Sequence, residues 1–267
     1  MMLFDGRKEA SFLDKKIEEY VKNHSVDKEL AIIQIGENLS SDKFIEIKKK
    51  LCDKFNIPVS TSYIKDSLSD EVIISLVKKI LDNDKVSGCI IQLPLPRKSL
   101  NKLLDLIPLE KDIDIISTEG KKSFYEGNFV TLPPVVRSLK HFIDGNKINL
   151  DNLDVTVIGD GDLVGKPIAY YLSKQKANVN VLSDYDGKCK ISCQLLILSA
   201  GVCNLVKGEN IEHACNVVDF GSSVINNKCV GDLDMNSKLD HLNFISKSPG
   251  GMGPLVVRYL IMNFLGI

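Results

Sequence analysis

One stretch decides the fold of the second half of the chain, and it reads Val155-Thr156-Val157-Ile158-Gly159-Asp160-Gly161-Asp162-Leu163-Val164-Gly165-Lys166-Pro167. It joins an apolar run of strand length to a segment, 165–174, whose apolar residues have helical spacing. Glycines after a strand allow a tight turn and let a pyrophosphate approach the backbone at the start of a helix. The spacing is GxGxxxG rather than the commoner GxGxxG, so the position of the loop strengthens an otherwise weak signal.

The loop predicts a site for a nicotinamide dinucleotide at the start of a βαβ unit. Asp184 lies just past the next apolar run, where a carboxylate can bind the ribose 2′-hydroxyl of NAD. Its charge, with Asp160 and Asp162 nearby, would repel the additional phosphate of NADP, so NAD is slightly favoured over NADP. The predicted cofactor contacts from this pattern are Gly159, Asp160, Gly161, Gly165 and Asp184. The alternative is a turn whose glycines serve only packing, with Asp184 solvated, and these residues alone leave the two readings close to even.

Apolar runs alternate with amphipathic stretches along the rest of the chain. In the first half this pattern predicts strands at 30–35, 60–64 and 88–93 and helices at 42–55 and 69–82. Such alternation implies parallel strands joined by crossover helices. In the second half it predicts strands at 155–158, 178–182, 195–199 and 217–220 and helices at 133–143, 165–174 and 254–265.

The expected architecture is α/β with two domains. An N-terminal α/β catalytic domain is expected over residues 1–143, and a C-terminal Rossmann-type dinucleotide-binding domain over 144–253. The boundary is placed near 144–149. The apolar helix within 254–267 needs a partner surface and is expected to pack back on the first domain. We expect an active cleft between the domains, where ligand sites often lie.

Composition excludes several classes of protein. The 267 residues carry 34 basic and 35 acidic side chains, scattered along the sequence, which disfavours a nucleic-acid partner. No apolar segment approaches the ~20 residues of a membrane span, and the start lacks the order of a signal peptide, so a cytoplasmic protein is expected. Seven cysteines, an odd number, fit that location. Cys189 and Cys193 have no histidine at ligand spacing, so no metal site is predicted.

Several further segments follow one another in a fixed order from about residue 30 to the end. They are GENLSS at 36–41 with FIEIKKK at 44–50, GCIIQLPLP at 88–96, KDID at 111–114, the glycine loop with VGKP at 164–167, DFG at 219–221 with GD at 231–232, and PGGMGP at 249–254. In this order they resemble the signatures of the bifunctional methylenetetrahydrofolate dehydrogenase/cyclohydrolase family. Any one segment could match by chance, but the ordered set is specific.

The resemblance implies two reactions of one-carbon metabolism, which supplies purine biosynthesis, and a homodimer. A hydride passes from 5,10-methylenetetrahydrofolate to NAD or NADP, and the methenyl product is hydrolysed to 10-formyltetrahydrofolate. It implies a proton-carrying Lys48, an orienting Gln92 and a pterin-holding Asp114. Phe44 lies four residues before Lys48, so both share one helix face. The further contacts implied are Leu93, Pro94, Pro249, Gly250 and Gly251 for the substrate and Ser222 for the cofactor.

Each of these residues also has a plainer interpretation. A lysine in the KKK run is usually on a solvated helix face, and Phe44 is more often a core residue than a stacking platform. Gln92 can satisfy a backbone group at a strand end, and Asp114 can cap the next segment. Only the joint pattern favours a functional site.

The sequence also departs from the family pattern. Phe44 replaces the tyrosine that precedes the lysine, Ile115 replaces a glycine, and Ser183-Asp184 replaces a histidine-serine pair that holds the NADP phosphate. The segments 130–135 and 246–248 also differ from the pattern. Three alternatives therefore stay open: a member that only oxidises, a dehydrogenase of another small substrate, and a catalytically silent relative that binds folate or nucleotide.

Overall fold

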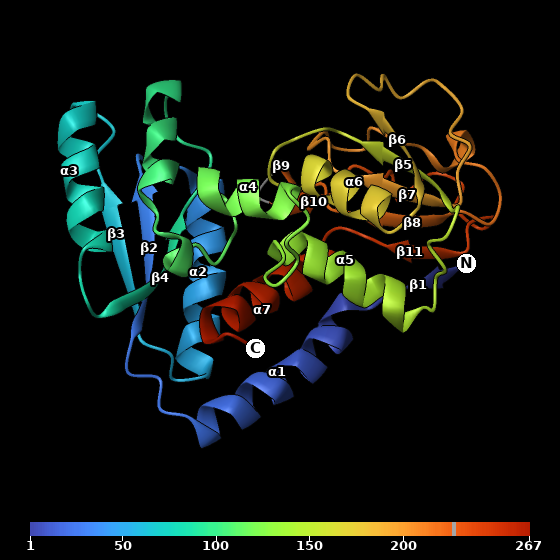
Figure 1. Ribbon diagram of the computed structural model, residues 1–267. Coiled ribbons are helices and arrows are strands. Elements are labelled where there is room, and N and C mark those ends of the chain that lie inside the picture. Colours follow the sequence, from blue (N-terminus) through green and yellow to red (C-terminus); the bar gives the residue numbers. More distant parts are fainter. Residues whose placement is uncertain (226–227) are drawn as a thin grey trace. The chain divides into compact units, whose positions relative to one another are not determined.

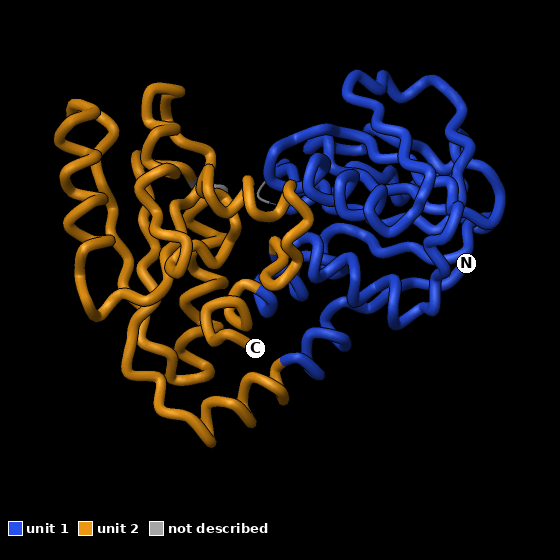
Figure 2. The backbone as a smooth tube through the Cα atoms, in the orientation of Figure 1, with its two compact units in different colours: residues 1–13, 134–259 blue, residues 14–133, 260–267 orange. Residues whose placement is uncertain are grey.

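The structure of the chain is a computed structural model that describes residues 1–225 and 228–267, and the side chains of Leu39 and Ser40 lie outside the described part. Backbone contacts divide the chain into two compact units, coloured separately in Figure 2. Unit 1 comprises residues 1–13 and 134–259, and unit 2 comprises residues 14–133 and 260–267. Both units are α/β, as the alternating pattern predicted.

Unit 2 is built on a three-stranded parallel sheet in the order β3-β2-β4. Its strands are β2 (Glu29–Ile35), β3 (Val59–Ile64) and β4 (Val86–Ile91). The helices α2 (Leu39–Lys54) and α3 (Asp70–Leu81) lie on opposite faces of this sheet (Figure 1). Because both faces are covered, residues 31–35 of the central strand are all buried. The parallel pairing expected for the first half is confirmed.

The less regular part of unit 2 folds into short helical turns. They are the 3₁₀ helices η1 (Lys98–Leu106) and η2 (Leu109–Lys111) and the helix α4 (Thr118–Tyr125). Ser117 caps α4, since its side chain accepts a hydrogen bond from the amide of Gly120. The buried ring of Phe124 anchors α4 in the unit.

Unit 1 contains a six-stranded sheet in the order β1-β11-β8-β7-β5-β6, and every pairing in it is parallel. Its strands are β1 (Met2–Leu3), β5 (Asp154–Ile158), β6 (Asn178–Leu182), β7 (Leu195–Leu198), β8 (Asn216–Asp219) and β11 (Phe244–Ser246). A separate antiparallel pair joins β9 (Ser223–Ile225) to β10 (Lys228–Val230). The chain passes from β5 to β6 on one side and then to β7 on the other, so the strand order reverses at β5, as in Rossmann-type sheets.

Five helical segments complete the chain: α1 (Gly6–Asn23), α5 (Pro134–Gly145), α6 (Gly165–Lys174), η3 (Gly208–Asn210) and α7 (Met252–Leu265). The sequence predicted α5, α6 and α7 and missed α1, whose Ala10, Leu13 and Ile17 are buried at helical spacing. Residues of α1 and of α7 fall in both units. The expected domain limits at 143/144 and 253/254 stay a prediction, and the helix α5 belongs to unit 1.

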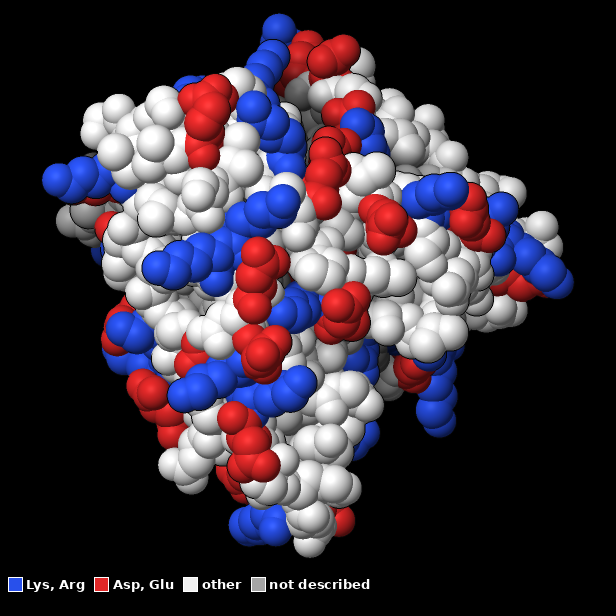
Figure 3. All heavy atoms as spheres, turned by 60° about the vertical axis from the view of Figure 1, so that its left-hand side comes forward, with Lys and Arg blue, Asp and Glu red and all other residues white. Residues whose placement is uncertain are grey.

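Acidic and basic side chains are mixed on one face of the protein. On the face drawn in Figure 3, lysine and arginine side chains are interspersed with aspartate and glutamate, and neither sign covers the face continuously. Within the described residues no helix is both long and apolar enough to cross a bilayer.

The last turns of α7 pack closely within unit 2. Asn263 donates hydrogen bonds to the carbonyl oxygens of Ile113 (2.9 Å) and Leu132 (3.0 Å). Gly88 of β4 lies against the ring of Phe264, since a Cβ atom at Gly88 would come within 2.5 Å of the ring carbon Cδ2. The strand therefore needs a residue without a side chain at this position.

We expect Gly88→Ala to lower the free energy of unfolding by about 1–3 kcal/mol, because the added methyl must displace a packed ring. The matched control is Gly253→Ala in α7, where a Cβ atom would meet nothing within 4 Å. Urea unfolding should show no loss for the control. An equal loss in both variants would contradict the close packing of β4 against α7.

Candidate active site

Two side chains predicted to be catalytic are hydrogen-bonded to each other in unit 2, and the third, Asp114, interacts electrostatically with the lysine of that pair. Lys48, on α2, donates a hydrogen bond from Nζ to Oε1 of Gln92 at 2.9 Å. Gln92 directly follows β4, and its Nε2 donates to the carbonyl oxygen of Leu93 at 2.8 Å. That second bond fixes the amide so that its oxygen faces the lysine. A helix and a strand end thus hold the lysine amine in one orientation.

Burial shifts the pKa values of Lys48 and Asp114. Desolvation lowers the pKa of Lys48, and the negative charge of Asp114 partly opposes that shift. Desolvation raises the pKa of Asp114, while the positive charge of Lys48 lowers it. Both side chains keep part of their surface open to solvent. The site therefore combines an amine that gives up its proton readily with a carboxyl group that retains one readily.

The predicted substrate contacts in unit 2 lie on α2, the helix that carries Lys48, or directly after Gln92 in the sequence. Phe44 lies one helical turn before Lys48 on α2 and is 38% exposed, so its ring is not part of the core. Leu93 is half-buried, and Pro94 follows it through a cis peptide bond and is exposed. An exposed ring next to a desolvated amine can stack against a flat aromatic ligand.

A buried carboxylate that the sequence did not single out as a site residue holds the turn that carries Asp114. Asp112 is 3% exposed and accepts hydrogen bonds from the amides of Ile116 (3.0 Å) and Ser117 (2.9 Å) and from the Ser117 hydroxyl (2.5 Å). The sequence contained an indication of this contact, because a serine that follows an aspartate by five residues, as Ser117 follows Asp112, can close such a turn. Asp112 thereby positions the backbone on both sides of Asp114.

The turn also contains a strained residue. Ile115 has a φ angle of +57°, in the left-handed region that a β-branched residue rarely adopts. This is the position where the family pattern has glycine. The substitution therefore keeps a backbone conformation suited to glycine and adds a buried isoleucine side chain.

The glycine loop of unit 1 has the geometry of a phosphate-binding turn. Gly159 directly follows β5 with a φ angle of +92°, and a Cβ atom there would lie 2.6 Å from the backbone of Ser199. At Gly165, the first residue of α6, a Cβ atom would lie 1.9 Å from the carbonyl oxygen of Gly159. Gly161 is exposed, and a Cβ atom there would meet nothing within 4 Å. The loop thus presents open backbone at the N-terminus of α6.

The other predicted cofactor residues follow neighbouring strands of the same sheet. Asp160 is exposed within the loop after β5, and Asp184 is exposed two residues beyond the end of β6. Ser222 lies between β8 and β9, and its hydroxyl is 3.4 Å from Sγ of Cys229. These residues therefore share the carboxyl edge of the sheet, where open α/β sheets bind their ligands.

The predicted glycine-rich substrate segment lies in unit 1, in the turn from β11 to α7. Pro249 follows a cis peptide bond, and Gly250 has a φ angle of +102°. Gly251 is buried against α1, because a Cβ atom on Gly6 would lie 1.6 Å from the carbonyl oxygen of Gly251. Unit 1 thus holds this segment, whereas unit 2 holds the Lys48 group.

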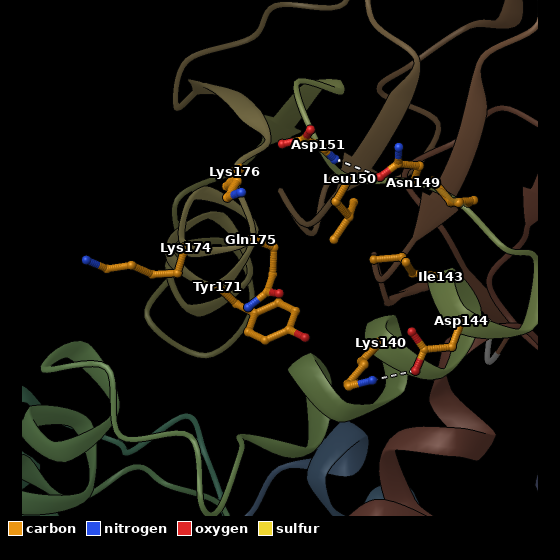
Figure 4. Close-up of a pocket in the computed structure, with 11 residues that line it drawn as sticks. Lys140, Ile143, Asp144, Asn149, Leu150, Asp151, Tyr171, Lys174, Gln175 and Lys176 are labelled. Atoms are coloured by element: carbon orange, nitrogen blue, oxygen red, sulfur yellow. Dashed lines mark hydrogen bonds and ion pairs between the residues drawn. The ribbon is translucent and has the colours of Figure 1, made fainter.

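A cavity of about 410 Å³ lies at the other edge of the unit 1 sheet (Figure 4). It is lined by residues of α5 and α6 and by the segments that precede β5 and β6. Lys140 and Asp144 form an ion pair there, and Tyr171 points into the space. The cavity therefore lies at the amino edge of the sheet, whereas the predicted cofactor residues lie at the carboxyl edge.

The arrangement defines a class of protein: an α/β protein with a dinucleotide-binding unit and a unit that carries a desolvated lysine. Comparison with known families agrees with this class. Residues 4–114 match the model of the tetrahydrofolate dehydrogenase/cyclohydrolase catalytic domain, and residues 133–267 match the model of the NAD(P)-binding domain of the same family. The chain belongs to the tetrahydrofolate dehydrogenase/cyclohydrolase family, and the resemblance seen in the sequence is confirmed.

Individual relatives match along the whole chain. The bifunctional protein FolD of Mycoplasma mobile is 31% identical over 278 residues, covering 100% of this chain and 97% of the relative. The crystal structure of the bifunctional enzyme FolD from Campylobacter jejuni has a TM-score of 0.89 at 26% identity, covering 99% of this chain and 97% of that one. The Trypanosoma brucei FolD structure, complexed with NADP and an inhibitor, also has a TM-score of 0.89, and at 22% identity it shows the shared fold.

The strain at Ile115 yields a stability prediction. Both Ile115→Gly and Ile116→Gly remove a buried side chain, but only the first also relieves a left-handed backbone. We expect Ile115→Gly to cost less unfolding free energy than Ile116→Gly by about 1–2 kcal/mol. Urea unfolding of the two variants measures the difference. A larger loss at Ile115 would show that its side-chain packing outweighs the strain.

Proposed function

We propose that this chain oxidises 5,10-methylenetetrahydrofolate with a nicotinamide dinucleotide and hydrolyses the methenyl product to 10-formyltetrahydrofolate. Membership of the family supports both reactions. The observation that carries the proposal is the desolvated amine of Lys48, held 2.9 Å from Gln92 and electrostatically coupled to Asp114. The C. jejuni relative bears the name of both activities.

Hydrolysis requires a group that moves a proton at neutral pH. Water adds to the methenyl carbon while the electron pair of the C=N⁺ bond returns to nitrogen, and the added water loses a proton. The resulting hydroxyl adduct then loses its O–H proton as the C–N5 bond breaks and N5 takes up a proton, which leaves the formyl group on N10. A neutral amine at Lys48 Nζ can accept the proton of the added water, and burial makes the neutral form accessible. Gln92 keeps the amine in place through its oxygen. Asp114, whose pKa is raised by desolvation, can hydrogen-bond to the polar edge of a pterin in its protonated form as well as its ionised form.

Hydride transfer needs alignment more than acid–base help. A bound nicotinamide would supply the acceptor for a hydride from the methylene carbon. The residues of this chain have two roles in that step. The loop from Gly159 to Gly165 would hold the pyrophosphate, because its backbone is uncovered at Gly161, shortly before α6. Phe44 would stack on the folate ring system from its exposed position on α2.

The loss of the tyrosine hydroxyl at position 44 bears mainly on hydrolysis. We propose that hydrolysis is retained, because Gln92 and desolvation act on Lys48 without that hydroxyl. A member that only oxidises is the second candidate, and the phenylalanine is the observation that favours it. Restoring the hydroxyl with Phe44→Tyr should raise the hydrolysis rate without changing cofactor binding.

We expect Lys48→Ala to lower methenyltetrahydrofolate hydrolysis by at least about 100-fold, the usual size of a general acid–base contribution. The matched control is Lys50→Ala on the same helix, since Lys50 is exposed and pairs only loosely with Glu46 at 3.5 Å. The measurement is the decay of methenyltetrahydrofolate absorbance above the buffer rate. Unchanged decay in folded Lys48→Ala would remove Lys48 from the mechanism.

The same assay has an expected pH profile. The reactive form of Lys48 is the neutral amine, so hydrolysis should rise with pH and level off below the ordinary lysine pKa of 10.5, because desolvation lowers the Lys48 pKa. A rate that keeps rising in step with an ordinary lysine would argue against the desolvated site.

We further propose that NAD is preferred over NADP. Asp184 is exposed just beyond β6, where its charge favours a ribose hydroxyl and opposes a phosphate. Asp184→Asn should therefore raise kcat/KM for NADP by about tenfold or more and leave NAD affected less. Asp186→Asn, which alters another exposed carboxylate two residues further on, is the control. A wild-type preference for NADP in reduced-nicotinamide absorbance would overturn this proposal.

The homodimer implied by the family resemblance and the cytoplasmic location expected from the sequence are part of the proposal and await direct measurement. A homodimer would be detected by sedimentation at micromolar concentration. A cytoplasmic location would be established by fractionation of the source cells. If neither cofactor supports turnover and both ligands bind to folded protein, the silent relative is the correct alternative.

A further inference from the structure

Two buried aspartates in unit 1 take no part in the chemistry proposed above. Asp219, the last residue of β8, is 2% exposed, and Asp232 is 0% exposed. Within residues 1–225 and 228–267, neither carboxylate forms an ion pair with a lysine or arginine. Buried charges without a cationic partner are rare and costly, so they need a structural reason.

The reason lies in the backbone amides that they accept. Asp219 Oδ1 accepts the amides of Gly221 (2.8 Å) and Asp232 (3.2 Å), and its Oδ2 accepts the amide of Leu233 at 3.1 Å. Asp232 Oδ2 accepts the amide of Gly201 at 3.0 Å. The pair therefore joins three segments: the loop after β7, the loop after β8, and the stretch around Asp232.

Glycines make this close approach possible. A Cβ atom on Gly221 would lie 2.2 Å from the carboxyl carbon of Asp232, and one on Gly231 would lie 2.0 Å from Oδ2 of Asp219. The Ser223 hydroxyl adds a direct link, because it donates to the carbonyl oxygen of Gly201 at 2.9 Å. The loops after β7 and β8 are thus fixed to one another as well as to the aspartates.

The sheet order indicates what these loops contact. The pyrophosphate turn follows β5, and the ribose-binding position Asp184 follows β6 on one side of it. A dinucleotide extended along the carboxyl edge places its adenosine half over β6 and its other half over β7 and β8. Ser222, a predicted cofactor contact, lies between Gly221 and Ser223, both of which take part in the linked loops.

We propose that Asp219 and Asp232 are positioning residues that hold the loops after β7 and β8 as one rigid floor for the nicotinamide half of the dinucleotide. The inference rests on the proposed dinucleotide function of unit 1. Desolvation raises the pKa of Asp219 to about 7, although its three amide partners act in the opposite direction. Asp232 lies beside it, and its pKa is also raised by desolvation.

The central test is Asp219→Asn, because an asparagine has one acceptor oxygen and its NH₂ group would face an amide N–H that now donates to Oδ1 or Oδ2. Calorimetry should compare NAD with ADP-ribose, and in parallel NADP with 2′-phospho-ADP-ribose. We expect the Kd of the full dinucleotide to rise about tenfold, with less than a twofold change for the fragment that lacks nicotinamide. A general loss of structure would weaken both ligands equally.

Two further variants keep the test decisive. Ser223→Ala removes a single neutral hydrogen bond near the surface, so it should fold even if Asp219→Asn does not. We expect this variant to raise the Kd of the full dinucleotide about threefold, without a comparable rise for the fragment that lacks nicotinamide. Asp240→Asn, at an exposed carboxylate, should bind both ligands like the wild type.

The outcomes separate the inference from the proposed function. Wild-type protein that binds neither dinucleotide overturns the function of unit 1 itself. Wild-type protein that binds normally, with Asp219→Asn or Ser223→Ala that binds both ligands normally or loses both equally, overturns the positioning role alone.

Discussion

Parallel strands impose one constraint on everything else in this protein: their carboxyl ends lie along a single edge of each sheet. In unit 2 that edge delivers Gln92, which directly follows β4, to the lysine on α2. In unit 1 it delivers the glycine loop after β5 and the exposed Asp184 after β6. Backbone hydrogen bonding between parallel strands therefore determines which segments of the chain lie at the same sheet edge. The polar side chains of those segments are the ones that can meet.

Desolvation shifts the pKa of a titratable group in each of the two units, but the two groups differ in their access to solvent. In unit 2 it acts on a lysine that stays partly open to solvent, so the altered proton affinity is available to a ligand. In unit 1 it acts on Asp219, which is enclosed and surrounded by amides. Desolvation thus shifts the proton affinity of a partly accessible amine in unit 2 and of an enclosed carboxyl group in unit 1.

Much of this arrangement could be predicted from the sequence. The alternation of apolar runs predicted seven of the parallel strands and most helices, because it reports burial directly, but it missed the short strands β1 and β11. The helix α1 was missed, although Ala10, Leu13 and Ile17 have helical spacing, because these apolar residues are sparse among charged ones. The left-handed backbone at Ile115 depends on tertiary packing, which no local pattern of residue types encodes.

The path of the chain has a consequence for biosynthesis. Met2 of β1 pairs with Phe244 of β11, so the edge strand β1 cannot pair until β11 has been synthesised. Unit 2 likewise receives residues 260–267 from the far end of the chain. Contacts this distant in sequence form late and slowly. During translation these contacts cannot form before residues 244–267 have been synthesised, so the first strand stays unpaired until then.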